Sequence, residues 1–393
     1  MVDGEIRRKA GFVMTAVVVA GALLGGGYFL LSRGQIDQRE EAASSRDAKE
    51  PVASILSMQG TTTLTETAYI TESSHAVFVT DTLLYAGVGE RVATYTFSLT
   101  GTLSEVASYQ LPESRQAMSI QINDDKMYVV DSHDMMSVLS VSNYLSPTLL
   151  GSFSHPISSP HKVAIYGDKA YISELADGSE PKGVRIIDVS TPNSPAEAGL
   201  FTMPHKDATR LDVMDRFLLV QKSDPDVGHL AIYDLESDYS TGPALISAYT
   251  PVSGTVGAFA AYSPTLFVGV SSRREPMGRI AVVDMTEIDA VPEIGSFGLP
   301  IDPNVKAPTR VFAADASASE LLIADGRRVP YTEDEDELLT TLRLFDTTVP
   351  ASISEVASIE ILAPSRPVEV ARSNDVVFVA AGYGGLKVYR IDR

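Results

Sequence analysis

Short segments in which apolar and polar residues alternate recur along the chain from about residue 64 onward. Seven of them share one form, an alternating strand followed by a polar turn. They lie at Arg91–Ser98, Met136–Ser142, Val184–Ser190, Leu230–Glu236, Ile280–Thr286, Leu342–Thr348 and Leu386–Asp392. Runs this short, with a period of two residues and Gly, Pro, Asn or Asp at their ends, predict β-strands.

The spacing of these segments predicts the architecture. Their aligned residues are Thr96, Ser140, Asp188, Asp234, Asp284, Asp346 and Arg390, so successive intervals are 44, 48, 46, 50, 62 and 44 residues. Each repeat holds further strand-like pieces, such as Lys162–Asp168 and Ala170–Glu174 in the third. Repeats of about 45 residues built from short strands are typical of propeller blades.

The fourth strand of the last repeat is expected at the other end of the chain. Six repeats are followed by a fourth piece, and the seventh is not. Leu64–Tyr69 (LTETAY) resembles Leu103–Tyr109 (LSEVASY), which is the fourth strand of the first repeat. We therefore predict an all-β fold, a seven-bladed β-propeller whose N-terminal strand closes the last blade and leaves no open edge.

One repeat carries a family resemblance. Ala170–Phe201 combines a short AYISE strand with GVRIIDVS at Gly183–Ser190, followed by Pro192 and Pro195. This pattern resembles the LVIVD-repeat family of propellers, and weaker copies extend the resemblance over about residues 66–393. The chain departs from the pattern at three aligned positions, Thr96, Ser140 and Arg390, where Asp is absent. The resemblance implies a propeller in an exported or cell-surface protein, and it transfers no catalytic residue.

The repeated Asp has a structural interpretation. An Asp at the end of a strand can accept hydrogen bonds from backbone N–H groups of the following turn. The alternative is a shared cation site. Because three repeats lack the Asp, the pattern favours turn capping.

The N-terminal 54 residues follow a different pattern. Gly11–Leu31 is a run of 21 uncharged residues, which as a helix spans about 30 Å and can cross a bilayer. We expect residues 1–10 to form a cytoplasmic tail, 11–31 a transmembrane anchor, 32–54 a polar stalk and 55–393 the propeller. Arg7, Arg8 and Lys9 before the span favour an N-terminus inside the cell. A cleaved signal peptide is the alternative, although its apolar region is usually shorter.

Two glycines in the predicted anchor, Gly21 and Gly25, have the spacing of close helix–helix contacts in lipid. They suggest a homodimer. The alternative is that glycine is simply frequent in membrane helices.

Composition excludes several function classes. The chain has no Cys and no Trp, so disulfides, thiol nucleophiles and iron–sulfur clusters are impossible. Its 31 Lys and Arg against 51 Asp and Glu give a net charge of −20, which argues against nucleic-acid binding. It has no G-x-S-x-G elbow, P-loop or strand-linked G-x-G-x-x-G.

The variable connections are predicted to gather on one face of the ring. Second-to-third strand connections and blade-to-blade connections emerge together, and loops on a rigid scaffold commonly carry binding residues. The longest, expected as a loop at Asp325–Thr341, explains the interval of 62 residues and contains the acidic run Glu333–Glu337. We interpret that run as a solvated cluster rather than a Ca²⁺ loop, because it lacks the alternating ligands and Gly.

Two residue sets are candidates for a site at the channel mouth. His75 and His161 each lie ten residues before an aligned Tyr, and His205 also precedes an inner strand, so three imidazoles there could bind a divalent cation. Four arginines near inner-strand starts are candidates for binding a carboxylate or polyanionic sugar, with blade-to-blade ion pairs as the alternative. They are Arg115, Arg210, Arg310 and Arg366.

Two functions remain open from the sequence. The first is a membrane-anchored, extracytoplasmic binding or assembly scaffold for a protein or envelope polymer, with no cofactor expected and the propeller in the periplasm or outside the cell. The alternative is an enzyme, a metal-dependent hydrolase or lyase with its site in the central funnel.

Overall fold

The computed structural model describes most of the residues after residue 61. The described ranges are 62–133, 135–154, 160–174, 183–202, 207–223, 229–237, 243–271, 278–299, 309–330, 336–350, 352–361 and 366–393. All of them lie in one compact unit, Ala53–Arg393. No helix within these ranges is long and apolar enough to cross a membrane. The predicted tail, anchor and stalk lie outside them.

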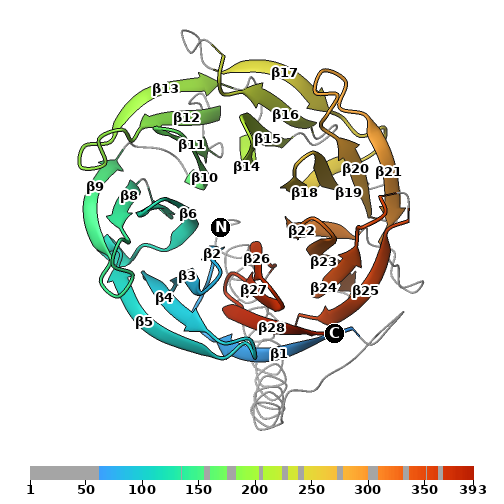
Figure 1. Cartoon of the computed structure of the whole chain (residues 1–393), viewed down its shortest axis with the longest axis horizontal. Helices are drawn as coiled ribbons and strands as arrows, with labels where there is room; N and C mark the ends of the chain where they lie inside the picture. Colours follow the sequence, from blue (N-terminus) through green and yellow to red (C-terminus); the bar gives the residue numbers. More distant parts are fainter. Residues whose placement is uncertain are drawn as a thin grey trace, which may run out of the picture. The chain divides into compact units, whose positions relative to one another are not determined.

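Seven antiparallel four-stranded sheets form the blades of a β-propeller (Figure 1). The inner strands are β2 (Val77–Val79), β6 (Ala117–Asn123), β10 (Pro160–Tyr166), β14 (Asp207–Met214), β18 (Thr255–Tyr262), β22 (Arg310–Ala316) and β26 (Glu369–Ser373). The second strands are β3 (Leu83–Val88), β7 (Lys126–Asp131), β11 (Lys169–Glu174), β15 (Phe217–Ser223), β19 (Thr265–Ser271), β23 (Glu320–Pro330) and β27 (Val376–Ala380).

The two outer positions of each blade complete the sheets. The third strands are β4 (Arg91–Phe97), β8 (Met135–Ser140), β12 (Gly183–Asp188), β16 (His229–Asp234), β20 (Arg279–Asp284), β24 (Asp336–Asp346) and β28 (Leu386–Asp392). The fourth strands are β5 (Leu103–Gln110), β9 (Thr148–Ser154), β13 (Ala196–Thr202), β17 (Ala244–Tyr249), β21 (Glu293–Gly298), β25 (Ser354–Glu360) and β1 (Thr63–Ile70). We number the blades 1 to 7 from β2 to β28.

The predicted closing strand is confirmed. β1 pairs with β28 from Thr63↔Asp392 to Ile70↔Leu386, so blade 7 has the order β26-β27-β28-β1. A register shift between Glu66 and Ala68 marks a bulge in β1. Each of the other six fourth strands has a shift at the matching place. β1 is therefore built as a true fourth strand.

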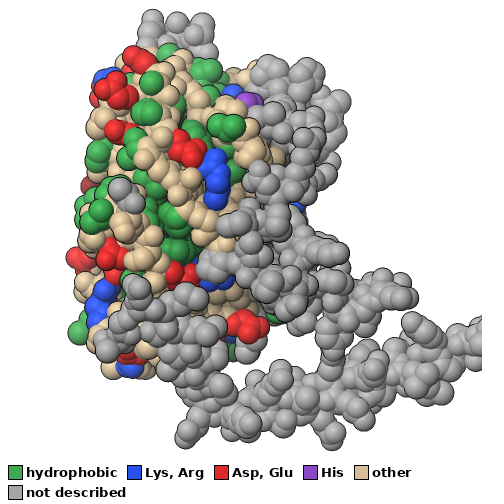
Figure 2. Space-filling model, turned by 90° about the vertical axis from the view of Figure 1, so that its right-hand side faces the viewer, with side chains coloured by type: hydrophobic (Ala, Val, Ile, Leu, Met, Phe, Trp, Pro, Cys, Tyr) green, Lys and Arg blue, Asp and Glu red, His purple; other side chains and the backbone are tan. Residues whose placement is uncertain are grey.

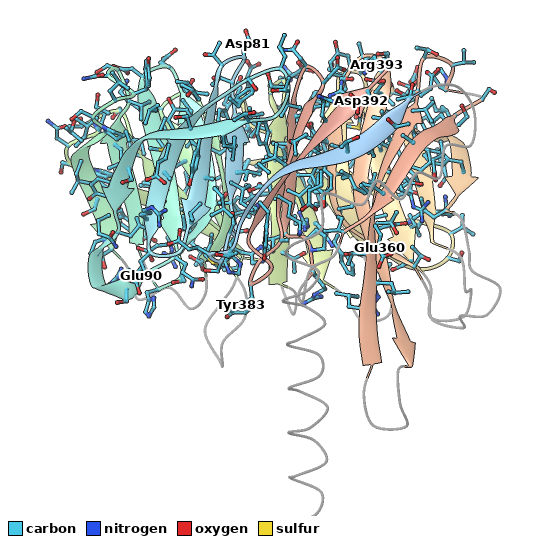
Figure 3. The ribbon with its side chains drawn as sticks, turned by 90° about the horizontal axis from the view of Figure 1, so that it is seen from below. Asp81, Glu90, Glu360, Tyr383, Asp392 and Arg393 are labelled. Carbon is cyan, nitrogen blue, oxygen red and sulfur yellow. The ribbon has the colours of Figure 1, made fainter. Side chains whose placement is uncertain are left out.

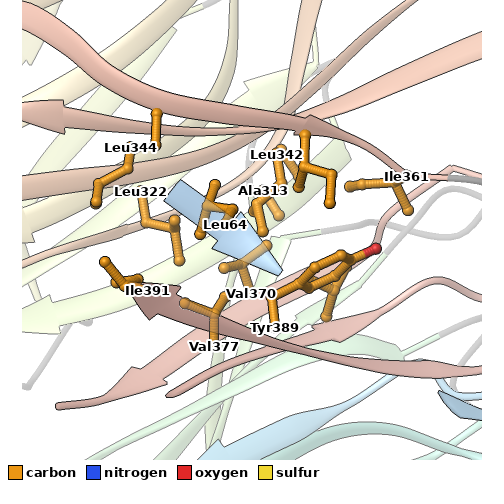
Figure 4. Packing of buried hydrophobic residues seen from close by; sticks show 14 residues of the cluster. Leu64, Ala313, Leu322, Leu342, Leu344, Ile361, Val370, Val377, Tyr389 and Ile391 are labelled. Carbon is orange, nitrogen blue, oxygen red and sulfur yellow. The ribbon is translucent and has the colours of Figure 1, made fainter. Parts of the chain in front are cut away.

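Apolar packing joins each blade to the next. Seven clusters of buried hydrophobic side chains occur among the described residues, one at each contact between neighbouring blades. Second strands such as β3 are buried almost throughout, because blades cover both of their faces. Leu64 of β1, only 2% exposed, packs in the cluster between blades 6 and 7 (Figure 4).

The outer rim has a mixed surface. Acidic, basic and hydrophobic side chains are interspersed on the side shown in Figure 2. Single apolar side chains of the fourth strands, such as Leu245 and Ile294, are half exposed. Single exposed apolar residues of this kind are usual on the surfaces of folded proteins.

The capping role of the repeated Asp is confirmed. Asp284 Oδ1 accepts hydrogen bonds from Thr286 N (2.8 Å) and Thr286 Oγ1 (2.7 Å), and Asp346 does the same with Thr348. Asp188 accepts from the backbone N–H and the hydroxyl of Ser190. These bonds to the charged carboxylate lower the pKa of Asp284, with the backbone N–H contributing most.

In blades 3 and 6 an arginine on the third strand forms ion pairs with carboxylates on the second and fourth strands. Arg185 of β12 contacts Glu174 (2.6 Å) and Glu197 (2.6 Å), and the Arg185 and Glu174 side chains are 7% and 3% exposed. Arg343 of β24 pairs in the same way with Asp325 (3.0 Å) and Glu355 (2.9 Å). Buried charges require such partners.

The predicted loop at 325–341 is largely a hairpin. β23 and β24 each have 11 residues and pair from Glu320↔Asp346 to Pro330↔Asp336. The expectation of a loop was therefore wrong for most of this segment, since the two blade strands simply continue outward. Residues 331–335, with part of the acidic run, lie outside the described ranges.

Candidate functional site

The propeller has two faces that differ in their connections. Glu90, Glu360 and Tyr383 lie on the face where second-to-third strand connections and blade-to-blade connections emerge, which we call the loop face (Figure 3). Asp81 and Arg393 lie on the opposite face. Each inner strand begins at the loop face, so the first residues of the inner strands surround that end of the channel.

Bulges shape these inner-strand starts. In four blades the pairing of the inner strand with the second strand skips one residue, and the skipped residues are Met118, His161, Thr209 and Phe312. A bulge redirects side chains and is frequent near functional sites. In these four blades the bulge therefore lies at the same position of the inner strand, and the skipped residues lie at the same level of the channel.

An ion pair crosses the channel at this depth. Lys162 Nζ of blade 3 lies 2.5 Å from Glu369 Oε1 of blade 7, and the Lys162 side chain is 7% exposed. Glu369 Oε2 also accepts a hydrogen bond from the backbone N–H of Val77 in blade 1 (2.9 Å). One carboxylate thus links three blades.

Arg210 of blade 4 also reaches across the channel. Its Nη2 donates to the carbonyl of Phe312 in blade 6 and to that of Val368, just before β26 (3.2 Å). Arg366 lies over the ring of the same Phe312, with Cζ 5.8 Å from the ring centroid. Two of the four predicted arginines therefore meet at one aromatic residue.

The other two predicted arginines do not join them. Arg115 pairs with Asp131 of its own blade at 3.3 Å. Arg310, the first residue of β22, is exposed. The expected ring of four arginines is therefore reduced to the pair Arg210 and Arg366.

The histidines follow the sequence prediction in part. His75 and His161 occupy equivalent places, each two residues before a Val that pairs with the second strand, Val77↔Ala86 and Val163↔Ile172. His75 also stacks edge-on against Tyr383, with centroids 5.6 Å apart. His205 lies outside the described residues, so the predicted set of three stays a prediction.

Burial sets the charge of the two described imidazoles. Burial, followed by the field of Lys162, lowers the pKa of His75. Burial and then the charges of Lys162 and Arg210 lower the pKa of His161 to about 4. Both rings are therefore neutral at pH 7. Within the described ranges, no three His, Asp or Glu side chains are placed to hold a metal ion.

Asp212 lies two residues after Arg210 on β14. Burial raises the pKa of Asp212 to about 6, and Val213 N donates a hydrogen bond to its Oδ1 (2.8 Å). The charges of Glu369 and Lys162 act on it in opposite directions. We call the side chains of His75, His161, Lys162, Arg210, Asp212, Arg366 and Glu369 the channel cluster.

A small cleft lies at the opposite face. It encloses about 300 Å³ between the turns of blades 1, 6 and 7, and its lining includes Asp81, Asp315, Glu320 and Arg372. Arg372 donates to Glu320 (2.7 Å) and to Ser317 (3.1 Å). Burial raises the pKa of Asp315 to about 6, against the lowering effect of Arg372. Arg372 and Glu320 thus satisfy each other, and together with Asp81 and Asp315 they make the cleft polar.

Sequence reasoning missed Lys162, Asp212 and Glu369. Each lies within an inner strand that reads as apolar and alternating, as in KVAIY and VEVAR. A charged residue inside such a strand was the available signal. It was not used because charged residues at strand ends are common on solvent-exposed turns.

Comparisons with known proteins agree with this geometry. The family model described as LVIVD repeat matches residues 114–155 and 159–202, which correspond to blades 2 and 3. The search of curated proteins found no match.

Solved structures share the fold at low sequence identity. A chain of the mitotic checkpoint complex matches with a TM-score of 0.58 and 14% identity, over 88% of this chain and 96% of the other. The WD40 β-propeller domain of Doa1 matches with a TM-score of 0.55 and 9% identity, over 86% and 97%. The computationally designed Ika8 protein matches with a TM-score of 0.52 and 11% identity, over 83% and 98%. The chain is therefore a seven-bladed β-propeller that carries LVIVD repeats.

Proposed function

We propose that this protein is a membrane-anchored scaffold that binds a protein or an envelope polymer through its loop face. The anchor is Gly11–Leu31, and the propeller lies outside the cytoplasmic membrane. The β-propeller fold with its LVIVD repeats supports a binding scaffold in this coarse sense. The partner class and the location are the parts that we propose.

The extended hairpin of blade 6 is the observation that carries the proposal. β22 pairs with β23 only as far as Arg310↔Gly326, and β25 pairs with β24 only as far as Thr341↔Glu360. Beyond these pairs β23 and β24 continue alone past the loop face, beside Glu360 (Figure 3).

That extension is not needed to build a blade. The other second and third strands have five to seven residues, and they complete their sheets without it. A two-stranded hairpin outside a sheet is only marginally stable in water. We infer that blade 6 keeps the extension because it contacts a partner.

The enzyme alternative has less support. It requires His205 to join His75 and His161 around a divalent cation, and His205 lies outside the described residues. The cations Lys162 and Arg210 act on His161 and disfavour a bound metal ion at that place. We therefore keep binding as the proposal.

A crosslinked pull-down from native membranes tests the partner. The variant replaces residues 327–339 by a short Gly-Ser link. It keeps Gly326, and it keeps Thr340, which is fully buried and donates to Ile361 O at 2.7 Å. The control replaces the exposed Leu99 and Thr100, in the β4–β5 turn on the opposite face, by Gly-Ser.

We expect the parent and the control to recover a stoichiometric partner and the shortened variant to lose it. All three proteins should melt at similar temperatures, because loop closure depends weakly on length. Undiminished partner recovery by a folded shortened variant would show that the hairpin is no part of the interface.

A protease experiment on spheroplasts tests the location. External protease should degrade the propeller and leave a fragment that ends near Ser32, because the chain after the anchor is outside. A propeller that becomes sensitive only after lysis would contradict the proposed orientation.

A further inference from the structure

The arginines of the propeller divide into two groups. Nine described arginines pair with a carboxylate, namely Arg91, Arg115, Arg185, Arg216, Arg279, Arg343, Arg372, Arg390 and Arg393. Within the described ranges Arg210, Arg310 and Arg366 have no such ion pair, although the net charge of the chain is −20. Two of these three meet at Phe312, with Arg210 at its carbonyl and the exposed Arg366 over its ring.

The charge balance of the channel cluster is positive. Its basic groups are Lys162, Arg210 and Arg366, and its carboxyl groups are those of Asp212 and Glu369; burial lowers the pKa of Lys162 and of Arg210, and the charge of Glu369 opposes this effect in both. Burial and these cations keep His161 neutral, with a pKa of about 4. The buried cations Lys162 and Arg210 are therefore matched in number by the carboxyl groups of Asp212 and Glu369, and the additional positive charge is that of Arg366, which is exposed at the end of the channel cluster.

Unused hydrogen-bonding groups lie in the same place. His75 Nε2 and His161 Nδ1 are buried and have no hydrogen-bond partner among the described residues. Arg210 uses only Nη2 for the two carbonyls, which leaves the hydrogens of Nε and Nη1 without a described acceptor. Buried polar groups without partners are uncommon in folded proteins.

We propose that the loop-face end of the channel is a binding site for a carboxylate, held by the guanidinium groups of Arg210 and Arg366. One negative charge matches the balance of the cluster. Both paired edges of a guanidinium include Nη2, which Arg210 already uses, so Arg366 supplies the fork that matches the two oxygens of a carboxylate, and Nε–H and Nη1–H of Arg210 each supply a single donor. The site opens on the proposed binding face, so it gives that face a preference for partners that bear exposed carboxylates.

This inference deepens the proposed function, and its test is independent of any partner. The probe is sodium acetate, which replaces chloride at constant ionic strength in a solution of the full chain at pH 7. Sodium sulfate serves as a second probe. The melting temperature gives an apparent dissociation constant, because a ligand that binds only the folded state stabilises it.

Two matched variants separate a site from a general salt effect. Arg366→Gln and Arg310→Gln each remove one exposed positive charge near an inner-strand start. We expect a saturable rise of the melting temperature with acetate in the parent and in Arg310→Gln. In Arg366→Gln the apparent dissociation constant should be at least about threefold higher. Arg210→Lys keeps the charge but loses the separate Nε–H and Nη1–H donors, so acetate affinity should fall about tenfold in it.

Three results would overturn the proposal. The first is an acetate effect no larger than that of chloride. The second is an equal effect in the two exposed-arginine variants. The third is saturation with sulfate but not with acetate, which would assign a tetrahedral anion instead. A lost partner with retained acetate binding would refute the proposed partner and leave the carboxylate site standing.

Discussion

The closing strand β1 gives the sharpest test of how the ring is held together. Leu64 is 2% exposed and packs with side chains of blades 6 and 7, among them Leu322, Tyr389 and Ile391 (Figure 4). Leu64→Ala removes buried methyl groups and leaves a cavity between the two blades. Substitutions of this kind cost about 2–5 kcal/mol in well-packed cores. Both neighbouring blades are rigid sheets that collapse little, so we expect about 3 kcal/mol.

Two further variants serve as references for the destabilisation by Leu64→Ala. Leu322→Ala removes the same group from the same cluster, and Leu322 lies in blade 6 with 2% exposure. Leu99→Ala removes it from a turn, where Leu99 is 74% exposed. If β1 is an integral strand, Leu64→Ala and Leu322→Ala should have similar costs, and Leu99→Ala should cost less than about 0.5 kcal/mol.

Urea unfolding followed by tyrosine fluorescence measures the three variants, since the chain has 16 Tyr and no Trp. The slope of the free energy of unfolding against urea concentration should be the same for all three variants. A Leu64→Ala variant that unfolds like Leu99→Ala would refute the reasoning. It would mean that the ring is held by six complete blades and that β1 adds little.

Three other changes have defined outcomes. Gly385→Ala should lower the melting temperature by several degrees, because φ is +80° and a Cβ would lie 2.0 Å from Ile70 O of the closing strand; Gly167→Ala, with φ of +54° and open space, is the control. Arg185→Met should cost about 3 kcal/mol in urea unfolding, because it removes the guanidinium that pairs with the buried Glu174, whereas Lys126→Met in an exposed pair should have little effect. Asp315→Asn should stabilise the fold at pH 7.5 and have little effect at pH 4. The folded-state pKa of about 6 lies above the ordinary aspartate value of 3.8, so the carboxyl costs stability as pH rises through 6 and the cost disappears near pH 4. Equal effects at the two pH values would contradict this.

The sequence was sufficient for the order of the strands and for the closure of the ring. The interval between aligned residues carries the blade period, and β1 repeats the pattern of β5 because both are fourth strands. The caps at Asp188, Asp284 and Asp346 were also predictable, since each bond reaches only two residues ahead.

The channel cluster could not be derived in the same way. Lys162 and Glu369 are 207 residues apart in the chain, and no local pattern gives the diameter of a ring. Bulges that skip His161 and Phe312 leave only a weak trace in the sequence. The hairpin at 325–341 was misjudged because its charged residues obscured the alternation of two continuing strands.

The closing strand also imposes an order on synthesis. Thr65 and its partner Asp392 are 327 residues apart, so β1 leaves the ribosome long before β28 exists. At about 5–20 residues per second the delay is roughly 15–65 s. During that time β1 presents an unpaired edge, and six blades can form without it. The ring can therefore close only after β28 has been synthesised. A chain that stops before β28 keeps an open edge that proteases and chaperones can recognise.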